Sequence, residues 1–146
     1  MIVERITSQE EVASILALED PMLDKQVLRK LDCSKAEWVQ GINNLIPNRD
    51  FMSMWAVKEG GLIKAYLIAV NAVAPPFSRS VVIPYQTFFG MKDDEGMLLL
   101  NTVRELVKEW AIEKGAKSIQ IFTDKPHINS QFGFVQERGV SMVLKL

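Results

Sequence analysis

The stretch DDEGMLLLNTVRELVKEWAIEKGAKSIQIF, residues 93–122, decides the fold. It begins with a turn over Asp93–Gly96 and continues as a helix in which apolar residues recur every three or four positions. Gly115 stands where helices commonly end, because glycine adopts the left-handed conformation of a C-terminal cap. Ser118–Phe122 then predicts a short buried strand. A strand, this helix and a second, parallel strand are therefore expected to form one right-handed crossover unit.

The two faces of the predicted helix differ in chemistry. Its apolar face holds Leu99, Val103, Leu106, Val107 and Trp110. Its polar face is expected to hold Asn101, Arg104, Glu105, Lys108 and Glu109. A helix of this kind packs one stripe against a sheet and leaves the other in water.

The first half of the chain predicts one strand followed by helices. Ile2–Ile6 alternates as a strand does, and a further helical stretch is expected over residues 22–31. Ser8 with Glu11, and Ser34 with Glu37, have the spacing of capping boxes, in which a hydroxyl and a carboxylate satisfy the first free N–H groups of a helix.

The middle and the end of the chain predict strands. The sequence predicts an antiparallel hairpin from residues 51–57 and 62–73, joined through Gly60 and Gly61, and then strands over 80–89, 134–137 and 140–146. Pro75 and Pro76 interrupt the sheet, because proline cannot donate a ladder hydrogen bond. The expected fold class is α/β (α+β), with one domain over residues 1–146 and a mixed sheet of about six to seven strands between helices.

Composition excludes several classes of partner and site. The formal net charge is -1, from 17 basic and 18 acidic residues, so no strong field favours nucleic acid or an anionic membrane. No apolar run has the length of a membrane span, and the start of the chain lacks the pattern of a signal peptide, so a soluble cytoplasmic protein is expected. Cys33 is the single cysteine and is expected to pack as a small apolar residue. Metal-ligand spacings are absent, and the three tryptophans are expected in the core.

The order of elements, the phrase EWAIEKGAKSIQIF and the pair Gly133-Phe134 before a terminal SMVLKL resemble the GNAT superfamily of acyl-CoA N-acyltransferases. The segment APPFSRS is similar to divergent GNAT-like proteins of phages and prophages. The resemblance implies a splayed sheet whose two central parallel strands admit the pantetheine arm of acyl-CoA. It also implies a loop with the motif Q/R-x-x-G-x-G/A that wraps the pyrophosphate at the start of the long helix.

This chain departs from that motif. Counting back without gaps from Trp110 and Gly115 places Glu95 at the Arg or Gln position and Leu98 and Leu100 at the two small positions. Carboxylates repel a pyrophosphate, and they can also cap the helix amides themselves. An alternative register forms a different cradle from Gly90, Lys92 and Gly96. The cofactor-binding residues that the resemblance implies are Phe88, Gly90, Lys92, Gly96, Met97 and Leu98.

Candidate catalytic residues are few. Where the family often places a basic Glu this chain has Gln86 or Thr87, and where the family often places an acidic Tyr it has Asn129. Tyr85 lies on the same predicted strand and could protonate a thiolate, although packing is the commoner role of such a tyrosine. The single histidine, His127, is expected at the surface.

Two functions follow from these residues. The leading expectation is a GNAT-like binding or assembly module without ordinary acetyltransferase activity and without a cofactor. The alternative is an N-acyltransferase that uses acetyl-CoA or another acyl-CoA and acylates a primary amine on a small molecule or a protein. Long apolar strands also make a homodimer plausible.

Overall fold

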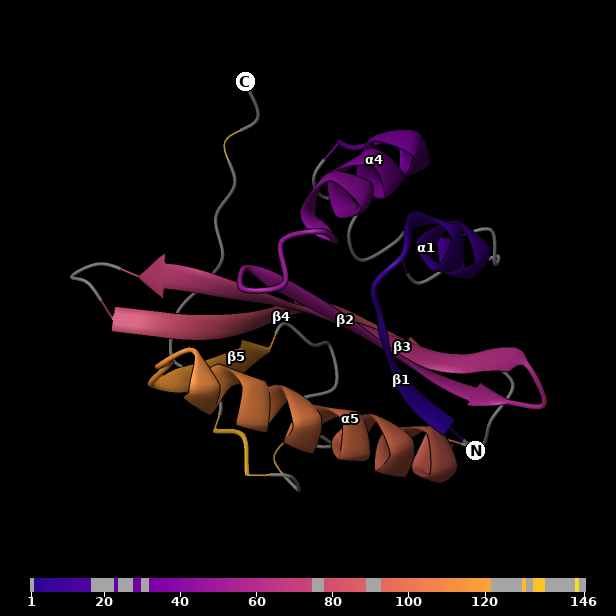
Figure 1. Ribbon diagram of the computed structural model, residues 1–146. Helices are drawn as coiled ribbons and strands as arrows, with labels where there is room; N and C mark the ends of the chain where they lie inside the picture. Colours follow the sequence, from indigo (N-terminus) through magenta and orange to yellow (C-terminus); the bar gives the residue numbers. More distant parts are fainter. Residues whose placement is uncertain are drawn as a thin grey trace.

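The structure, a computed structural model, describes residues 2–16, 23, 28–29, 32–74, 78–88, 93–121, 130, 133–135 and 144, with the backbone alone at 16, 73–74, 78–79, 84–88, 93–97 and 99–100. Two helices cover one side of a sheet and a third covers the other (Figure 1). In chain order the elements are β1 (Ile2–Ile6), α1 (Gln9–Leu16), α4 (Lys35–Leu45), β2 (Met52–Glu59), β3 (Leu62–Ala74), β4 (Ser78–Phe88), α5 (Asp93–Glu113) and β5 (Ser118–Ile121). This mixed α+β architecture confirms the expected fold class.

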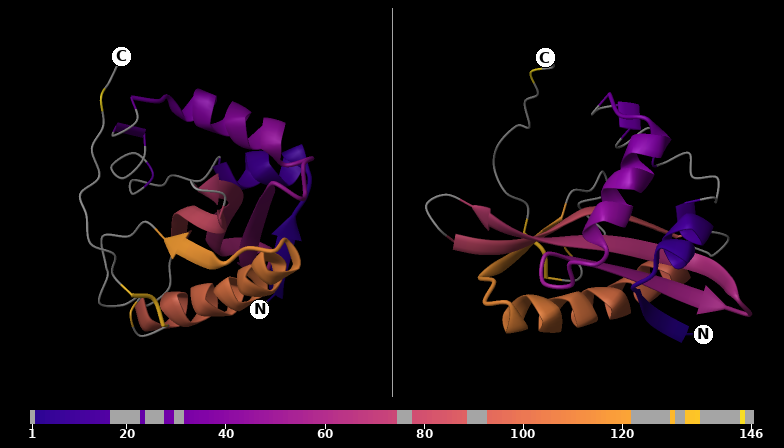
Figure 2. Two further views of the ribbon diagram at one scale, coloured as in Figure 1. Left: turned by 90° about the vertical axis from the view of Figure 1, so that its left-hand side faces the viewer. Right: turned by 45° about the horizontal axis from the view of Figure 1, so that its top comes forward.

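The strands follow one another in the sheet in the order β1-β2-β3-β4-β5. The first three pairings are antiparallel and the last, β4 with β5, is parallel. Figure 2 shows the twisted sheet edge-on, with α5 on one side. The described chain thus has five strands instead of the expected six to seven, and the two predicted last strands, 134–137 and 140–146, lie almost wholly outside the described residues.

Local sequence signals account for the turn and for both helix starts. Gly60 and Gly61 have φ angles of 57° and 78°, which is the backbone that a tight hairpin between β2 and β3 requires. The Ser34 hydroxyl accepts the N–H of Glu37, and the Glu37 carboxylate accepts the N–H of Ser34, so the capping box predicted for α4 is present. At α1, the Ser8 hydroxyl accepts the N–H of Glu11 at 3.1 Å.

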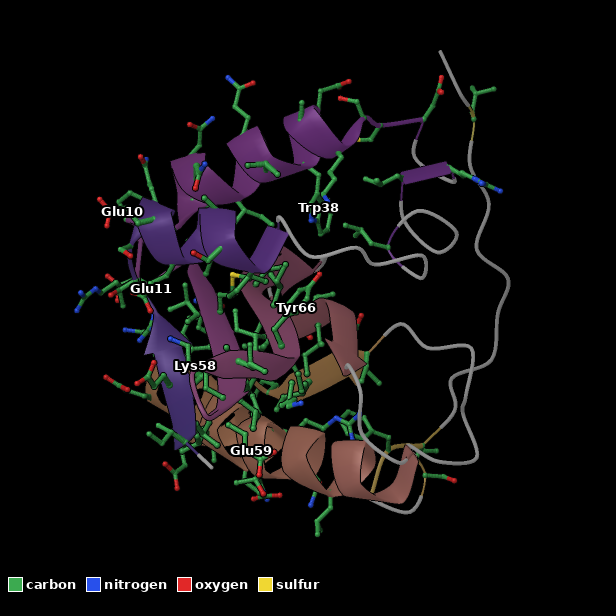
Figure 3. The ribbon with its side chains drawn as sticks, turned by 90° about the vertical axis from the view of Figure 1, so that its right-hand side faces the viewer. Glu10, Glu11, Trp38, Lys58, Glu59 and Tyr66 are labelled. Atoms are coloured by element: carbon green, nitrogen blue, oxygen red, sulfur yellow. The ribbon has the colours of Figure 1, made fainter. Side chains whose placement is uncertain are left out.

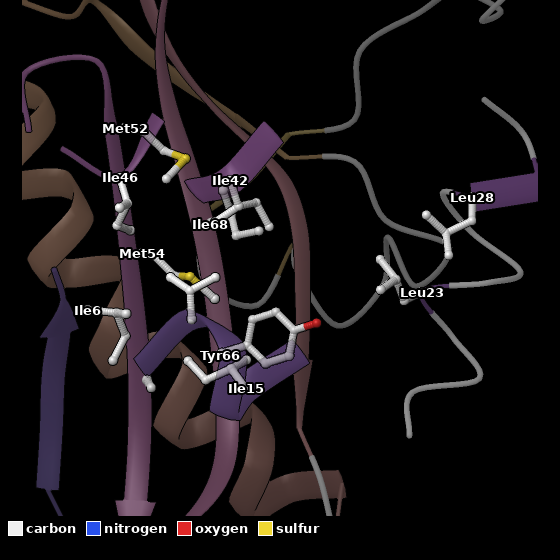
Figure 4. Close-up of a cluster of buried hydrophobic side chains, with 12 residues drawn as sticks. Ile6, Ile15, Leu23, Leu28, Ile42, Ile46, Met52, Met54, Tyr66 and Ile68 are labelled. Carbon is white, nitrogen blue, oxygen red and sulfur yellow. The ribbon is translucent and has the colours of Figure 1, made fainter. Parts of the chain in front are cut away.

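Two apolar cores lie on opposite sides of the sheet. The core under α1 and α4 includes Ile6, Val12, Ile15, Ile42, Ile46, Met52, Met54, Tyr66 and Ile68 (Figure 4). The core under α5 includes Val57, Leu67, Val81, Ile83, Val103, Val107 and Trp110. Because successive residues of a strand point to opposite faces, β3 places Tyr66 and Ile68 in one core and Leu67 in the other.

The predictions for the single cysteine and for the three tryptophans are confirmed. Cys33 is half-buried against the core under α1 and α4, and Trp38, Trp55 and Trp110 all lie in or against a core. Figure 3 shows Trp38 of α4 and Tyr66 of β3 between the helices and the sheet. The prediction that β5 is buried is wrong, because its residues alternate between exposed and half-buried at the end of the described sheet.

An ion-pair cluster joins β1, α1 and β2 at the other end of the sheet. The Lys58 ammonium lies 2.8 Å from Glu4 and 3.7 Å from Glu11 (Figure 3). Its hydrogen bond to Glu4 raises the pKa of Lys58 above its usual value. All three side chains are partly exposed, so water weakens the attraction between them. The cluster therefore contributes little to the free energy of unfolding, and its main effect is to orient α1 on the sheet.

Candidate functional site

The described pairing of the parallel strands β4 and β5 covers part of the length of β4. Their described register runs from Ser80 opposite Ser118 to Ile83 opposite Ile121. The first rung is reinforced by the two serine hydroxyls, which are 3.0 Å apart. Beyond this region β4 continues to Phe88, and its described pairing there is with β3 alone. Within the described chain, the last residues of β4 therefore present one edge with backbone groups that no strand covers.

A bulge lies in β4 just after the last described pair with β5. Ile68 is opposite Tyr85 but Val70 is opposite Val82, so β4 carries one more residue than β3 across this step. Pro84 stands within the inserted region and has no N–H to donate. Bulges bend a strand and end its regular pairing. The bulge therefore bends β4 just after Ile83, the last residue of β4 with a described partner in β5.

Helix α5 begins just after this open edge. It starts at Asp93, five positions after Phe88, and the connection at 89–92 lies outside the described residues. The turn predicted over Asp93–Gly96 is thus wrong, because these residues already form the first helical turn. The first four N–H groups of a helix have no partner within it and carry the positive end of its dipole.

Leu98 belongs to the second turn of α5 and its side chain is 64% exposed. Helical N–H groups from the second turn onward donate to carbonyls four residues earlier. The backbone N–H groups of Leu98 and Leu100 are therefore engaged inside the helix, and these two positions are not part of a loop. The three positions that the ungapped alignment matches to the glycine-rich motif, Glu95, Leu98 and Leu100, thus all lie within α5.

Some of the predicted site residues lie in the two described elements on either side of residues 89–92. Tyr85, Gln86 and Phe88 lie in β4 opposite Ile68, Leu67 and Ala65, and Gly96 and Met97 lie at the start of α5. Gly90, Lys92, His127 and Asn129 fall outside the described residues. The last residues of β4 and the first two turns of α5 thus hold six of the predicted positions, with Leu98 included.

The prediction that Arg104 lies on the polar face of α5 is wrong. The residue is only 4% exposed, and its guanidinium carbon lies 5.7 Å from the centre of the Phe134 ring. Desolvation lowers the pKa of Arg104 to about 10. The spacing of residues around a helix could have predicted that Arg104 is buried. Position 104 is three residues before Val107 and seven before Ala111, so all three lie on one face, and Val107 and Ala111 are both buried.

Neither a metal site nor a membrane span is found in the described parts of the chain. No group of three His, Cys, Asp or Glu residues there is arranged to hold a metal ion. No described helix has the length and apolar character needed to cross a membrane.

No family model matches the sequence, and no curated protein has significant sequence similarity to it. Solved structures, in contrast, match along the whole chain. A predicted acetyltransferase with acetyl-CoA from Clostridium acetobutylicum has a TM-score of 0.73 and 17% identity, covering 99% of this chain and 95% of its own. AAC(6')-Iy in complex with a bisubstrate analogue of CoA has a TM-score of 0.73 and 12% identity, covering 100% and 99%.

Ribosomal-protein-alanine N-acetyltransferase from Brucella melitensis biovar Abortus 2308 has a TM-score of 0.65 and 9% identity, with 100% of both chains covered. This chain has the GNAT fold. The resemblance noted in the sequence is confirmed at the level of the fold, since identities this low carry no information on the reaction. In this GNAT fold β4 and β5 are the parallel pair, and α5 is the long helix that follows the candidate site.

Proposed function

We propose that this protein is an acyl-CoA-dependent N-acyltransferase. The observation that carries the proposal is that, in the described part of the chain, Tyr85–Phe88 of β4 pair with β3 alone and stand a few residues before the amide-bearing start of α5. An extended, amide-containing chain can pair with such an edge as an additional strand does. A diphosphate can bind the helix start, where the N–H groups and the dipole favour negative charge.

The described backbone fits the two anchoring parts of acyl-CoA. The edge of β4 at Tyr85, Gln86 and Phe88 offers peptide groups for the pantetheine arm, and the first turn of α5 offers N–H groups for the pyrophosphate. Gly96 would let a phosphate approach the helix closely because it has no side chain. Gly90, Lys92, Met97 and Leu98 complete the proposed binding region, with Lys92 as the cation. The thioester of the bound acyl-CoA would supply the activated acyl group.

The helix start argues against the expectation of an inactive module. That expectation depended partly on leucines at two small motif positions, but both leucines lie in the second turn of α5. The acidic residues Asp93, Asp94 and Glu95 remain as an unfavourable charge next to a diphosphate. Backbone amides and Lys92 would have to outweigh this repulsion. We therefore expect modest affinity for acyl-CoA.

Tyr85 is the proposed proton donor for the departing thiolate. Its position in β4 is opposite Ile68, which packs in the core under α1 and α4. Gln86 and Asn129 are proposed to orient the acyl group or the amine by hydrogen bonds. Their side-chain amides do not titrate near neutral pH and therefore cannot act as a general acid or base. Water would take the proton of the amine. The acceptor is proposed to be a primary amine of a small molecule or a protein.

A calorimetric or fluorescence melting experiment with CoA and acetyl-CoA tests the proposal. A ligand present at a hundred times its dissociation constant stabilises the folded protein by about 2.7 kcal/mol. We expect a clear rise in melting temperature with either ligand, and no comparable rise with ATP at the same concentration. An unchanged melting temperature at millimolar CoA would overturn the proposal that the protein is an enzyme and would support a binding or assembly module.

Tyr85→Phe separates binding from chemistry. Loss of the hydroxyl should leave the CoA-dependent shift unchanged and slow acyl transfer to a panel of amines by roughly 100-fold, the usual contribution of a general acid. Equal loss of binding and turnover would contradict the role assigned to the hydroxyl.

A further inference from the structure

Polar side-chain atoms are buried on the α5 side of the sheet. The hydroxyl of Ser53 and the indole Nε1 atoms of Trp55 and Trp110 make no hydrogen bond among the residues that the structure describes. Ser53 is 1% exposed and Trp110 is 5% exposed. Buried hydroxyl and N–H groups nearly always have a partner, because an unpaired one destabilises the folded state. The core under α5 therefore holds polar atoms that the neighbouring protein groups do not satisfy.

Ser53 faces α5 from the middle of the sheet. It stands two positions before Trp55 in β2, and Trp55 packs against the core under α5, so both residues face that core. Ser53 is opposite Ala69 of β3, which packs in the same core as Trp110 and Ala111 of α5. Ala69 and Ala111 are among the smallest side chains. The Ser53 hydroxyl thus lies in the layer that Trp110 occupies, next to a small residue.

Arg5 of β1 connects the backbone at Ser53 with the Trp110 ring. Its Nη2 atom donates to the Met52 carbonyl at 3.4 Å, and this carbonyl belongs to the peptide group that joins Met52 to Ser53. The same atom donates to the Arg49 carbonyl at 2.8 Å. The guanidinium carbon of Arg5 lies 5.8 Å from the centre of the Trp110 ring. Ser53 and Trp110 are therefore both neighbours of one guanidinium group.

We propose that one water molecule is bound between β2 and α5, where it accepts the N–H of Trp110 and donates to the hydroxyl of Ser53. Buried waters typically make about three hydrogen bonds to polar groups that the protein leaves unsatisfied. An indole N–H only donates, and a hydroxyl also accepts, so a water molecule satisfies both groups without a change of charge. The bound water would link the middle of the sheet to the second half of α5. This site does not depend on the proposed function.

The sign of the stability change in Ser53→Ala tests the bridge. Removal of a buried hydroxyl that has no partner raises the melting temperature, because the cost of burying it is removed. Removal of a hydroxyl that holds a water leaves the Trp110 N–H unpaired, and we expect the melting temperature to fall by roughly 2 to 5 °C. A melting temperature equal to or above that of the wild type would overturn the proposal.

A double-mutant cycle tests whether Ser53 and Trp110 share the same water. Trp110→Phe removes the N–H and keeps an aromatic ring. Because a shared bridge can be lost only once, the unfolding equilibrium constant of the double variant should be at least about threefold below the product of the two single effects.

Ser80→Ala is the matched control for this cycle. Ser80 is 2% exposed, and its hydroxyl lies 3.0 Å from the Ser118 hydroxyl, so its partner is a protein group. Its effect and that of Trp110→Phe on the unfolding equilibrium constant should multiply to within about twofold. Simple multiplication in both cycles, or an equal deviation in both, would overturn the shared bridge.

A crystal structure of the wild-type protein identifies the bound molecule directly. We expect electron density for one water within about 3.2 Å of both Ser53 Oγ and Trp110 Nε1. A direct hydrogen bond between these two atoms, or a contact without water, would overturn the proposal. Crystals grown with bromide distinguish a small anion held beside Arg5, because bromide gives an anomalous signal. A bromide peak at this position would also overturn the assignment of water.

Discussion

Charged side chains connect the end of α5 with the loop before β2. The Lys114 ammonium donates a hydrogen bond to Asp50 Oδ1, and Arg5 donates to the Arg49 carbonyl at 2.8 Å. The hydrogen bond from Lys114, followed by its charge, lowers the pKa of Asp50 below its ordinary value of 3.8. Because the Asp50 side chain is 82% exposed, water and salt weaken this pair.

Asp50→Asn should reduce the loss of stability in acid. A carboxyl whose pKa is lower in the folded state stabilises the fold above its ordinary value of 3.8, and this contribution disappears as the pH falls through the folded pKa. Urea unfolding between pH 6 and 2 should therefore show a slightly shallower decline for the variant. Lys114→Gln should produce the same change. Identical profiles for wild type and both variants would show that the pair has no effect on stability.

Helix α4 depends on its capping box. Ser34→Ala removes the acceptor for the Glu37 N–H and should lower the free energy of unfolding by about 1 kcal/mol in urea denaturation. Ser14→Ala is the matched control, because the Ser14 hydroxyl bonds the Glu10 carbonyl inside α1, where alanine is a better helix former. A loss at Ser14 as large as the loss at Ser34 would contradict the capping argument.

The start of α5 should show opposite effects on stability and on binding. Gly96 lies in the first helical turn, so Gly96→Ala should raise the free energy of unfolding by up to about 1 kcal/mol. The added methyl group should weaken CoA binding, because it occupies the close approach proposed for the phosphates. Isothermal titration and urea unfolding measure the two effects. Unchanged CoA affinity would remove Gly96 from the binding region.

On the scale of the whole molecule, the sheet joins two cores that should unfold together. Leu67 and Ile68 are adjacent in β3 and are both almost completely buried, one in each core. Leu67→Ala and Ile68→Ala should each cost about 2 to 5 kcal/mol. Calorimetry should show one transition in both variants, shifted to lower temperature. Two separate transitions would contradict the expectation of a single domain over residues 1–146.

The extent to which the sequence predicted the structure differs between local and distant features. Strand β3 was predicted over residues 62–73 and is Leu62–Ala74, and the predicted strand 80–89 is Ser78–Phe88. Apolar runs bounded by glycine turns predict the ends of such strands to within a few residues. The start of α5 was missed because three acidic residues and a glycine are as typical of a turn as of a first helical turn.

By itself the sequence determined the features that depend on neighbours in the chain, such as the Ser34–Glu37 capping box and the Gly60-Gly61 hairpin. Only the tertiary structure decided where β4 bulges against β3 and that Arg104 is buried. Both outcomes depend on residues far apart in the sequence, since the bulge forms between β3 and β4 and the Phe134 ring lies near the Arg104 guanidinium. The periodicity of apolar residues along the chain carries no information about such long-range contacts.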